Sequence, residues 1–335
     1  MSAVIYKCPN CGGDLRFEPE GQQFRCEYCQ SEFSKGQIGD FSEAAGMLYS
    51  CPSCGAELVA EETTAATFCY YCHNPVVLAG RVQGEYHPDG ILPFEIDRKK
   101  ALEIFGKWIA GKKYVPKAFY SQDQVEKMTG VYFPYWLYDC QVEGKLEGEA
   151  RKQTSWTEGS MRLTQTEEYE IRREGTMEIN HVARNALSKA NRKLAEGVMP
   201  FEMEKLQPFH MGYLSGFMAE NRDMEQGAFA PDIEAEIRQF AEDSLRSGIS
   251  GYHSVNVRAK ETQIQNPRWS YVLMPVWALT YRDNRTDKVY YFACNGQTGK
   301  VCGELPVDER RLLQLFLSVF APVLAVLLAV GYFIL

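Results

Sequence analysis

Eight of the eleven cysteines in this 335-residue chain form four Cys-x-x-Cys pairs near the N-terminus. The first set is Cys8, Cys11, Cys26 and Cys29, and the second is Cys51, Cys54, Cys69 and Cys72. Two thiolates two residues apart can bind one metal ion, and two such pairs complete the tetrahedral four-sulfur shell that suits Zn²⁺. The spacing therefore predicts two zinc ions per chain, each held by four cysteines.

The two sets belong to a duplicated unit, because each cysteine of the second set lies 43 residues beyond its counterpart. Each unit is too short to bury a core of its own, so bound metal must supply the folding free energy, on the order of 10–16 kcal/mol. We therefore expect two tandem zinc ribbons, over residues 1–40 and 41–80. Disulfides, a redox Cys-x-x-Cys motif and a rubredoxin-like iron site are the alternatives for this spacing.

The charge of the ribbon region bears on the kind of partner. Residues 1–80 carry four basic and ten acidic side chains, a net charge of −6, within a chain of net charge −8. Two Zn²⁺ ions with four thiolates each make this region still more negative. Nucleic-acid binding gains most of its affinity from Lys and Arg against phosphate. A nucleic-acid partner is therefore disfavoured, although many zinc ribbons bind one.

The C-terminus predicts a membrane anchor. The segment Leu312–Leu335 has no charged side chain and, as a helix, would be about 36 Å long, enough to cross a hydrocarbon core of about 30 Å. A buried core helix is the alternative. Arg310 and Arg311 precede the segment, so the positive-inside rule places the N-terminal domains in the cytoplasm. We expect residues 306–335 to be a single-pass tail anchor in the cell membrane.

Residues 81–305 have the pattern of an α+β domain with an antiparallel sheet, and two similar aromatic motifs, at 131–136 and 272–277, suggest two related halves. Strict alternation of small or apolar with polar residues from Cys140 to Arg151 predicts a long strand with one wet face. The other expected elements are helices at 41–48, 97–110, 184–194 and 232–247, a turn at 154–160, a returning strand at 161–172 and a hairpin at 289–304.

No catalytic signature is present in the sequence. A P-loop, a Gly-x-Ser-x-Gly motif, a His-Glu-x-x-His motif and a dinucleotide-binding fingerprint are all missing. Cys140, Cys294 and Cys302 lie in predicted strands and are expected to be small core residues, although a thiol enzyme is an open alternative. We therefore expect a protein that is not an enzyme.

Several longer motifs carry a family resemblance. They are Cys-Pro-Asn-Cys-Gly-Gly-Asp-Leu at 8–15, Cys-Pro-Ser-Cys-Gly-Ala-Glu-Leu at 51–58, Ile-Leu-Pro-Phe at 91–94, Gly-Val-Tyr-Phe-Pro-Tyr-Trp-Leu-Tyr-Asp at 130–139 and Asn-Gly-Gln-Thr-Gly-Lys-Val-Cys-Gly-Glu-Leu-Pro at 295–306. In these the chain resembles bacterial membrane-anchored proteins with TFIIB-type zinc ribbons, often from phage-shock-like envelope-stress operons. Members often carry a glycine after the last knuckle, where this chain has Gln30 and His73.

The resemblance implies a non-enzymatic adaptor that recruits cytosolic proteins, such as phage-shock-like or flotillin-like proteins, to the inner face of the membrane. Protein contacts would come from the ribbon tips, with Tyr28, Tyr70 and Tyr71 as candidates. The alternative is a nucleic-acid-binding or regulatory zinc-ribbon factor held at the membrane.

Overall fold

The computed structural model describes residues 3–4, 6–38, 49–50, 57–58, 63–69, 74–78, 82, 84–190, 192–283, 286 and 288–334. The strands are β1 (Ala3–Val4), β2 (Leu15–Glu18), β3 (Gln23–Cys26), β4 (Glu32–Phe33), β5 (Tyr49–Ser50), β6 (Glu57–Leu58), β7 (Thr64–Phe68), β8 (Pro75–Leu78), β9 (Gly90–Ile91), β10 (Thr129–Glu158), β11 (Met161–Asn185), β12 (Gln207–Pro208), β13 (Met218–Glu220), β14 (Ser254–Arg282), β15 (Val289–Asn295) and β16 (Val301–Gly303). The α-helices are α1 (Arg98–Ile109), α2 (Gln122–Val125), α3 (Arg192–Gly197), α4 (Ala230–Ser247) and α5 (Glu309–Ile334).

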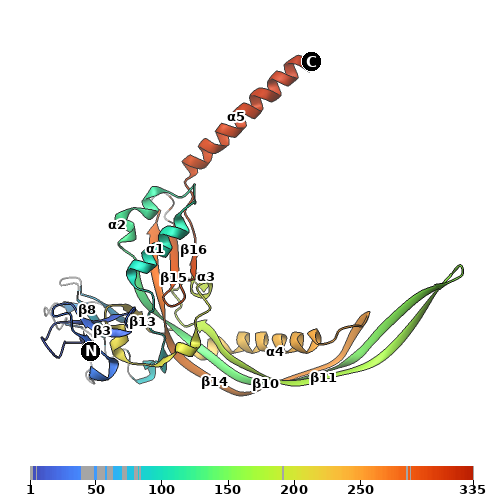
Figure 1. Cartoon of the computed structure of the whole chain (residues 1–335), viewed down its shortest axis with the longest axis horizontal. Helices are drawn as coiled ribbons and strands as arrows, with labels where there is room; N and C mark the ends of the chain where they lie inside the picture. Colours follow the sequence, from blue (N-terminus) through green and yellow to red (C-terminus); the bar gives the residue numbers. More distant parts are fainter. Residues whose placement is uncertain are drawn as a thin grey trace.

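A large mixed sheet forms the body, in the order β1-β8-β7-β13-β10-β14-β15-β16 (Figure 1). Most neighbours are antiparallel, but β13 runs parallel to β10 and β9 runs parallel to β14. The two aromatic motifs pair directly, with Val131 opposite Val276 and Tyr135 opposite Val272. The predicted antiparallel sheet is thus corrected to a mixed one in a large α+β domain.

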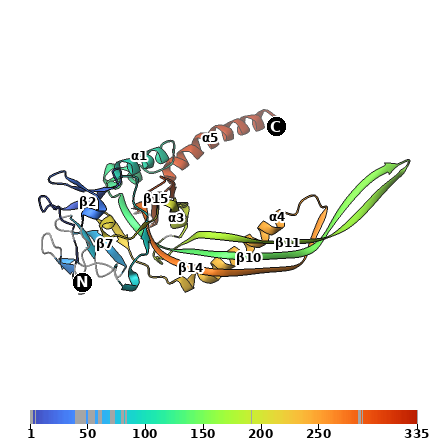
Figure 2. The same cartoon turned by 60° about the horizontal axis from the view of Figure 1, so that its bottom comes forward.

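The long strands β10 and β11 leave the body as an arm, with β14 beside β10 over part of its length (Figures 1 and 2). The predicted alternation is confirmed, because Cys140, Val142, Gly144 and Leu146 are buried while the residues that alternate with them are more exposed. The turn lies at Gly159–Ser160, later than the start predicted, and Gly159 has a φ of +65°.

Helices cover the sheet as their sequences predict. In α1, the Asp97 side chain accepts a hydrogen bond from the Lys100 amide at 2.7 Å, and Phe105 packs on Phe292 with ring centroids 4.9 Å apart. In α4, Ile233 and Ile237 are buried against the arm. The helix predicted around 184–194 is wrong, because β11 runs to Asn185 and α3 starts at Arg192.

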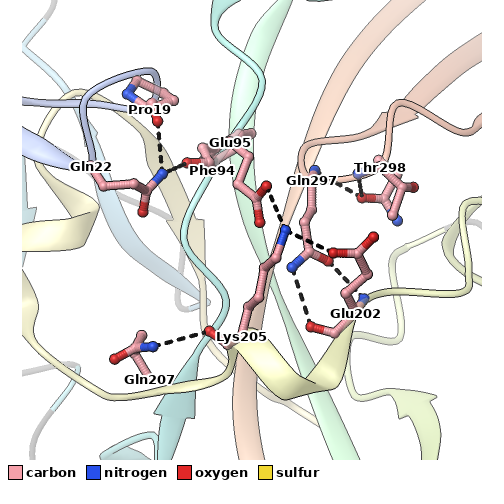
Figure 3. Close-up of polar contacts among 10 residues, drawn as sticks. Pro19, Gln22, Phe94, Glu95, Glu202, Lys205, Gln207, Gln297 and Thr298 are labelled. Carbon is pink, nitrogen blue, oxygen red and sulfur yellow. Dashed lines mark hydrogen bonds and ion pairs between the residues drawn. The ribbon is translucent and has the colours of Figure 1, made fainter.

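The turn between β15 and β16 joins several parts of the chain (Figure 3). The Gln297 side chain accepts a hydrogen bond from the Glu202 amide and donates one to the Glu202 carbonyl. Nearby, Lys205 binds both Glu95 and Glu202. The Asn-Gly-Gln-Thr-Gly motif therefore has a structural use, which is to fix the segments that surround the sheet.

The second ribbon is not an independent unit, which corrects the prediction of two tandem ribbons. Its hairpin, β7 and β8, belongs to the large sheet, where β13 pairs with β7 and β1 pairs with β8. Every residue of β8 is buried, so this strand needs cover on both faces. The first ribbon forms its own three-stranded sheet, β2-β3-β4, whose alternating burial leaves one wet face. The helix predicted at 41–48 lies outside the described residues.

The predicted tail anchor over 306–335 and the single-pass membrane localisation are contradicted. In the ranges that the structure describes, no helix is long and apolar enough to cross a membrane. Helix α5 begins with Glu309, Arg310 and Arg311, and its side chains are described through Leu324. The uncharged part within those limits, 312–324, is shorter than the about 20 apolar residues that a span requires. The side chains of 325–335 lie outside the described residues.

Candidate metal centre

The four cysteines of the first ribbon converge at one point. Their sulfur atoms all lie within 4.8 Å of one another, with Cys8 Sγ 3.6 Å from Cys29 Sγ and Cys11 Sγ 3.4 Å from Cys26 Sγ. Sulfurs at the corners of a tetrahedron with Zn–S bonds of about 2.3 Å are about 3.8 Å apart. The geometry therefore fits one zinc ion bound by four thiolates.

Two tight turns place these sulfurs. The Gly12 amide donates to the Cys8 carbonyl at 2.9 Å, and the Gln30 amide donates to the Cys26 carbonyl at 3.0 Å. Each turn ends in the left-handed region, at φ +72° for Gly12 and +61° for Gln30. A glycine adopts this conformation without strain, whereas Gln30 pays a steric cost.

The sulfurs differ in how readily they lose a proton. Hydrogen bonds from the Ser31 side chain and backbone lower the pKa of Cys29 to about 6. For Cys11, a backbone hydrogen bond from Gly13 favours the thiolate, but contacts with Cys29 and Cys26 outweigh it and raise the pKa to about 12. Four thiols this close cannot all ionise without a cation, which is the electrostatic reason that the group suits a divalent metal.

One face of the first ribbon is docked on the body (Figure 1). Phe17 and Phe24 pack against Tyr213, with ring centroids 5.0 and 6.1 Å away, and Phe17 also approaches Phe217. The Phe17 amide donates to the Ser215 carbonyl at 3.1 Å. The ribbon is therefore an integral part of the fold rather than a freely presented module.

A further contact links the ribbon to the segment before α1. The side-chain nitrogen of Gln22, Nε2, donates to the carbonyls of Pro19 and Phe94, both at 2.7 Å (Figure 3). Phe94 itself stacks on Phe217 with ring centroids 4.2 Å apart. The first ribbon is thus in contact with a residue of the core of the body.

The opposite side of the ribbon is open. Both knuckles are exposed, and Tyr28 at the second knuckle has 75% of its surface accessible. Of the predicted tyrosine contacts, Tyr28 is placed at this tip, whereas Tyr70 and Tyr71 lie outside the described residues. The knuckle surface, defined as residues 9–12 and 27–30, is the exposed part of the metal centre.

The second set of cysteines is only partly described. Cys69 is buried, while Cys51, Cys54 and Cys72 lie outside the described residues, so a second four-cysteine cluster is not seen. The duplication itself is visible in the backbone pairing. Phe24 pairs with Phe33 in the first repeat. Thr67 pairs with Val76 in the second, at the same 43-residue offset.

The remaining three cysteines lie in the body, as predicted. Cys140 and Cys294 are buried in β10 and β15, and burial raises the pKa of both thiols, to about 12 for Cys294. Cys302 is half-buried in β16 and lies against Gly197. Thiols that hold their protons and lie in the core are poor nucleophiles.

One feature was not predicted from the sequence, an apolar cavity of about 270 Å³ between the sheet, α3 and the segment that precedes α3. Its walls include Phe133, Leu194 and Tyr291, and Lys189 and Glu220 form an ion pair of 3.1 Å among its lining residues. These residues come from strands and loops far apart in the sequence, so no local pattern could have predicted the cavity.

Comparison with known proteins gives one informative similarity. Over 319 residues the chain is 36% identical to the uncharacterized protein YdjG of Bacillus subtilis (strain 168), and the alignment covers 93% of each protein. No family model and no solved structure matches the chain.

Proposed function

The chain belongs to the family of the Bacillus subtilis protein YdjG. We propose that it is a non-enzymatic adaptor that binds a protein partner through the knuckle surface of its zinc centre. The observation that carries this proposal is the orientation of the ribbon. Its aromatic face is used to dock on the body, while the knuckles and Tyr28 face solvent. A rigidly held, exposed aromatic side chain is a typical anchor of a protein interface.

The charges of the ribbon favour a protein over a nucleic acid. Three of its four basic side chains form ion pairs within the ribbon: Lys7 with Asp14, Arg16 with Glu27 and Arg25 with Glu18. The fourth, Lys35, donates to the Pro208 carbonyl and lies over the Tyr213 ring. Basic groups engaged in this way are poorly placed to neutralise phosphates.

Phage-shock-like or flotillin-like proteins are the proposed partners, on the strength of the sequence resemblance. The metal content proposed is two zinc ions per chain. The second site rests on the repeated cysteine spacing and on the amide of Cys69, which donates to the Asn74 carbonyl at 2.9 Å as Cys26 donates to Ser31 at 2.9 Å.

A binding experiment with single-tyrosine variants tests the adaptor proposal. Purified full-length protein would be titrated with a phage-shock-like and a flotillin-like protein from the same organism. Tyr28→Ala should weaken binding at least tenfold, since an interface anchor contributes about 2 kcal/mol or more. Tyr120→Ala removes an exposed tyrosine from the body and should leave affinity unchanged.

Two results would contradict the proposal. Equal binding by the wild type and Tyr28→Ala would move the contact away from the knuckles. Salt-sensitive retardation of DNA or RNA by the wild-type protein, with no binding to either protein, would favour the nucleic-acid factor instead.

A further inference from the structure

The arm has an open strand edge. Strand β11 pairs with β10, and no other strand of the described chain pairs with its far side. The arm projects away from the body in both views, so this edge is not shielded by the ribbon or the main sheet (Figures 1 and 2). A long edge of unpaired amides and carbonyls is a template for another strand, and natural proteins cover or block such edges.

When two copies of β11 run antiparallel with Glu170 opposite Glu170, the numbers of any two residues that face each other add up to 340. Glu170 would face Glu170, which is an unfavourable pair, but most residues on either side of it are complementary to those of a second copy. The opposite-charge pairs are Arg162 with Glu178, Glu167 with Arg173 and Glu168 with Arg172. Within one chain Glu168 also pairs with Arg151, and Arg172 with Glu147 and Glu174, so the contacts between copies would extend these exposed ion pairs into a network. The apolar pairs are Met161 with Ile179, Leu163 with Met177 and Tyr169 with Ile171, and Thr164 faces Thr176. Directly opposed side chains share a face of the sheet, so these pairs would be in contact.

Exposed apolar side chains lie at the tip of the arm and on the helix that packs against it. Met161 is 65% exposed and Trp156 is 45% exposed, and Trp156 pairs with Leu163 on one face of the arm tip. Phe240 of α4 is 56% exposed. It lies one turn after Glu236, which binds Arg184 of β11, so Phe240 is on the β11 flank of the helix.

The pairing would bury these side chains together. In the register centred on Glu170, the partner's Met161 and Leu163 lie beside Ile179 and Met177. Both of these residues pack against α4. The apolar tip of one arm would thus be covered by the flank of α4 in the other copy, where Phe240 is exposed. By symmetry the contact forms twice.

The regularly paired part of the edge is bounded by a turn at one end and by an irregularity at the other. At one end, the strand begins after the turn at Gly159–Ser160. At the other end, the pairing shifts between Tyr138 and Cys140, and His181 has a φ of +59° while its amide donates to the Asp139 carboxylate. The interval 161–179 is therefore the part of the edge without a register shift, about 60 Å long at about 3.4 Å per residue.

We propose that two copies of this chain associate through antiparallel pairing of their β11 edges, centred on Glu170. The paired arms form one continuous sheet, to which each copy contributes β10 and β11, and also β14 where it flanks β10, with the bodies at opposite ends. The dimer presents two zinc ribbons, which raises the apparent affinity for any partner that has more than one binding site. The pairing does not depend on the identity of that partner.

A cysteine at the two-fold axis tests the register. In the full chain, in a mild detergent that covers the apolar side chains of α5, Glu170→Cys should form an intermolecular disulfide under mild oxidation, because directly opposed Cα atoms are about 4.5–5.5 Å apart. Glu168→Cys, exposed on the same face, lies about 13 Å from its counterpart in this register and should not link. The wild-type chain gives the background from native cysteines. Equal linking of both variants, or none by Glu170→Cys, would overturn the proposed register.

Charge reversal tests the pairing without a covalent bond. Arg172→Glu with Arg173→Glu should weaken the dimer by about 100-fold, and Glu167→Arg with Glu168→Arg should do the same, because attraction becomes repulsion at four pairs. A mixture of the two variants should restore a dimer of two 38.1 kDa chains, which contains one chain of each kind. A wild type that is monomeric, or variants that dimerise as well as it does, would refute the proposal.

Discussion

Replacing Phe24 by alanine tests whether the first ribbon is held on the body by its aromatic face. Phe24 is 1% exposed, with ring centroids 5.4 Å from Phe17 and 6.1 Å from Tyr213. A buried Phe→Ala substitution costs about 3–5 kcal/mol. Zinc binding contributes on the order of 10–16 kcal/mol to a ribbon, so the ribbon should keep its metal. The loss should appear mainly as easier separation of the ribbon from the body.

Hydrogen exchange of the Phe17 amide measures this separation, because that amide donates to the Ser215 carbonyl across the contact. A cost of about 3 kcal/mol predicts exchange at least about 100-fold faster in Phe24→Ala, with zinc content unchanged. Tyr28→Ala, which removes an exposed ring from the same ribbon, should exchange at the wild-type rate. Wild-type exchange in Phe24→Ala would refute the docking role, and loss of zinc would assign Phe24 to the support of the metal shell.

Three further substitutions have expected outcomes. Gln30→Gly should strengthen zinc binding by the first ribbon by up to about 1 kcal/mol, or leave it unchanged, because residue 30 has a φ of +61°. Chelator-competition assays measure this. Asn295→Ala should lower the free energy of unfolding by about 3 kcal/mol in urea titration, since its buried amide donates to the Val198 and Pro200 carbonyls and accepts from two amides of the turn. Gly296→Ala should lower the melting temperature by several degrees, as its Cβ would lie 2.5 Å from Phe94, whereas Gly227→Ala, with open space around it, should not.

Local patterns in the sequence predicted the parts of the fold that depend on local forces. The cysteine spacing predicted the convergence of Cys8, Cys11, Cys26 and Cys29, because each knuckle is a short turn and the metal joins the two. Asp97 predicted the start of α1, since an N-cap acts within one turn. The alternation after Cys140 predicted the long arm strand, which needs only one buried face.

Features set by distant contacts were not predictable in this way. The 43-residue repeat implied two equivalent ribbons, but the buried run Val76–Leu78 draws the second hairpin into the large sheet. The apolar composition of the C-terminal segment predicted a membrane span that the described part of α5 does not support. Phe24 packs against Tyr213, which lies nearly 200 residues later in the sequence, and no spacing rule connects the two.

The zinc centre itself is tested most directly by X-ray absorption at the zinc edge, together with zinc counting, on the full-length protein. The geometry predicts a shell of four sulfurs at about 2.3 Å and no nitrogen or oxygen ligand. Cys11→Ser should lose the zinc of the first ribbon, since its Sγ is one of the four that converge there. A zinc-free protein with intact disulfides, or a shell that Cys11→Ser leaves unchanged, would contradict the assignment of Cys8, Cys11, Cys26 and Cys29 as a metal centre.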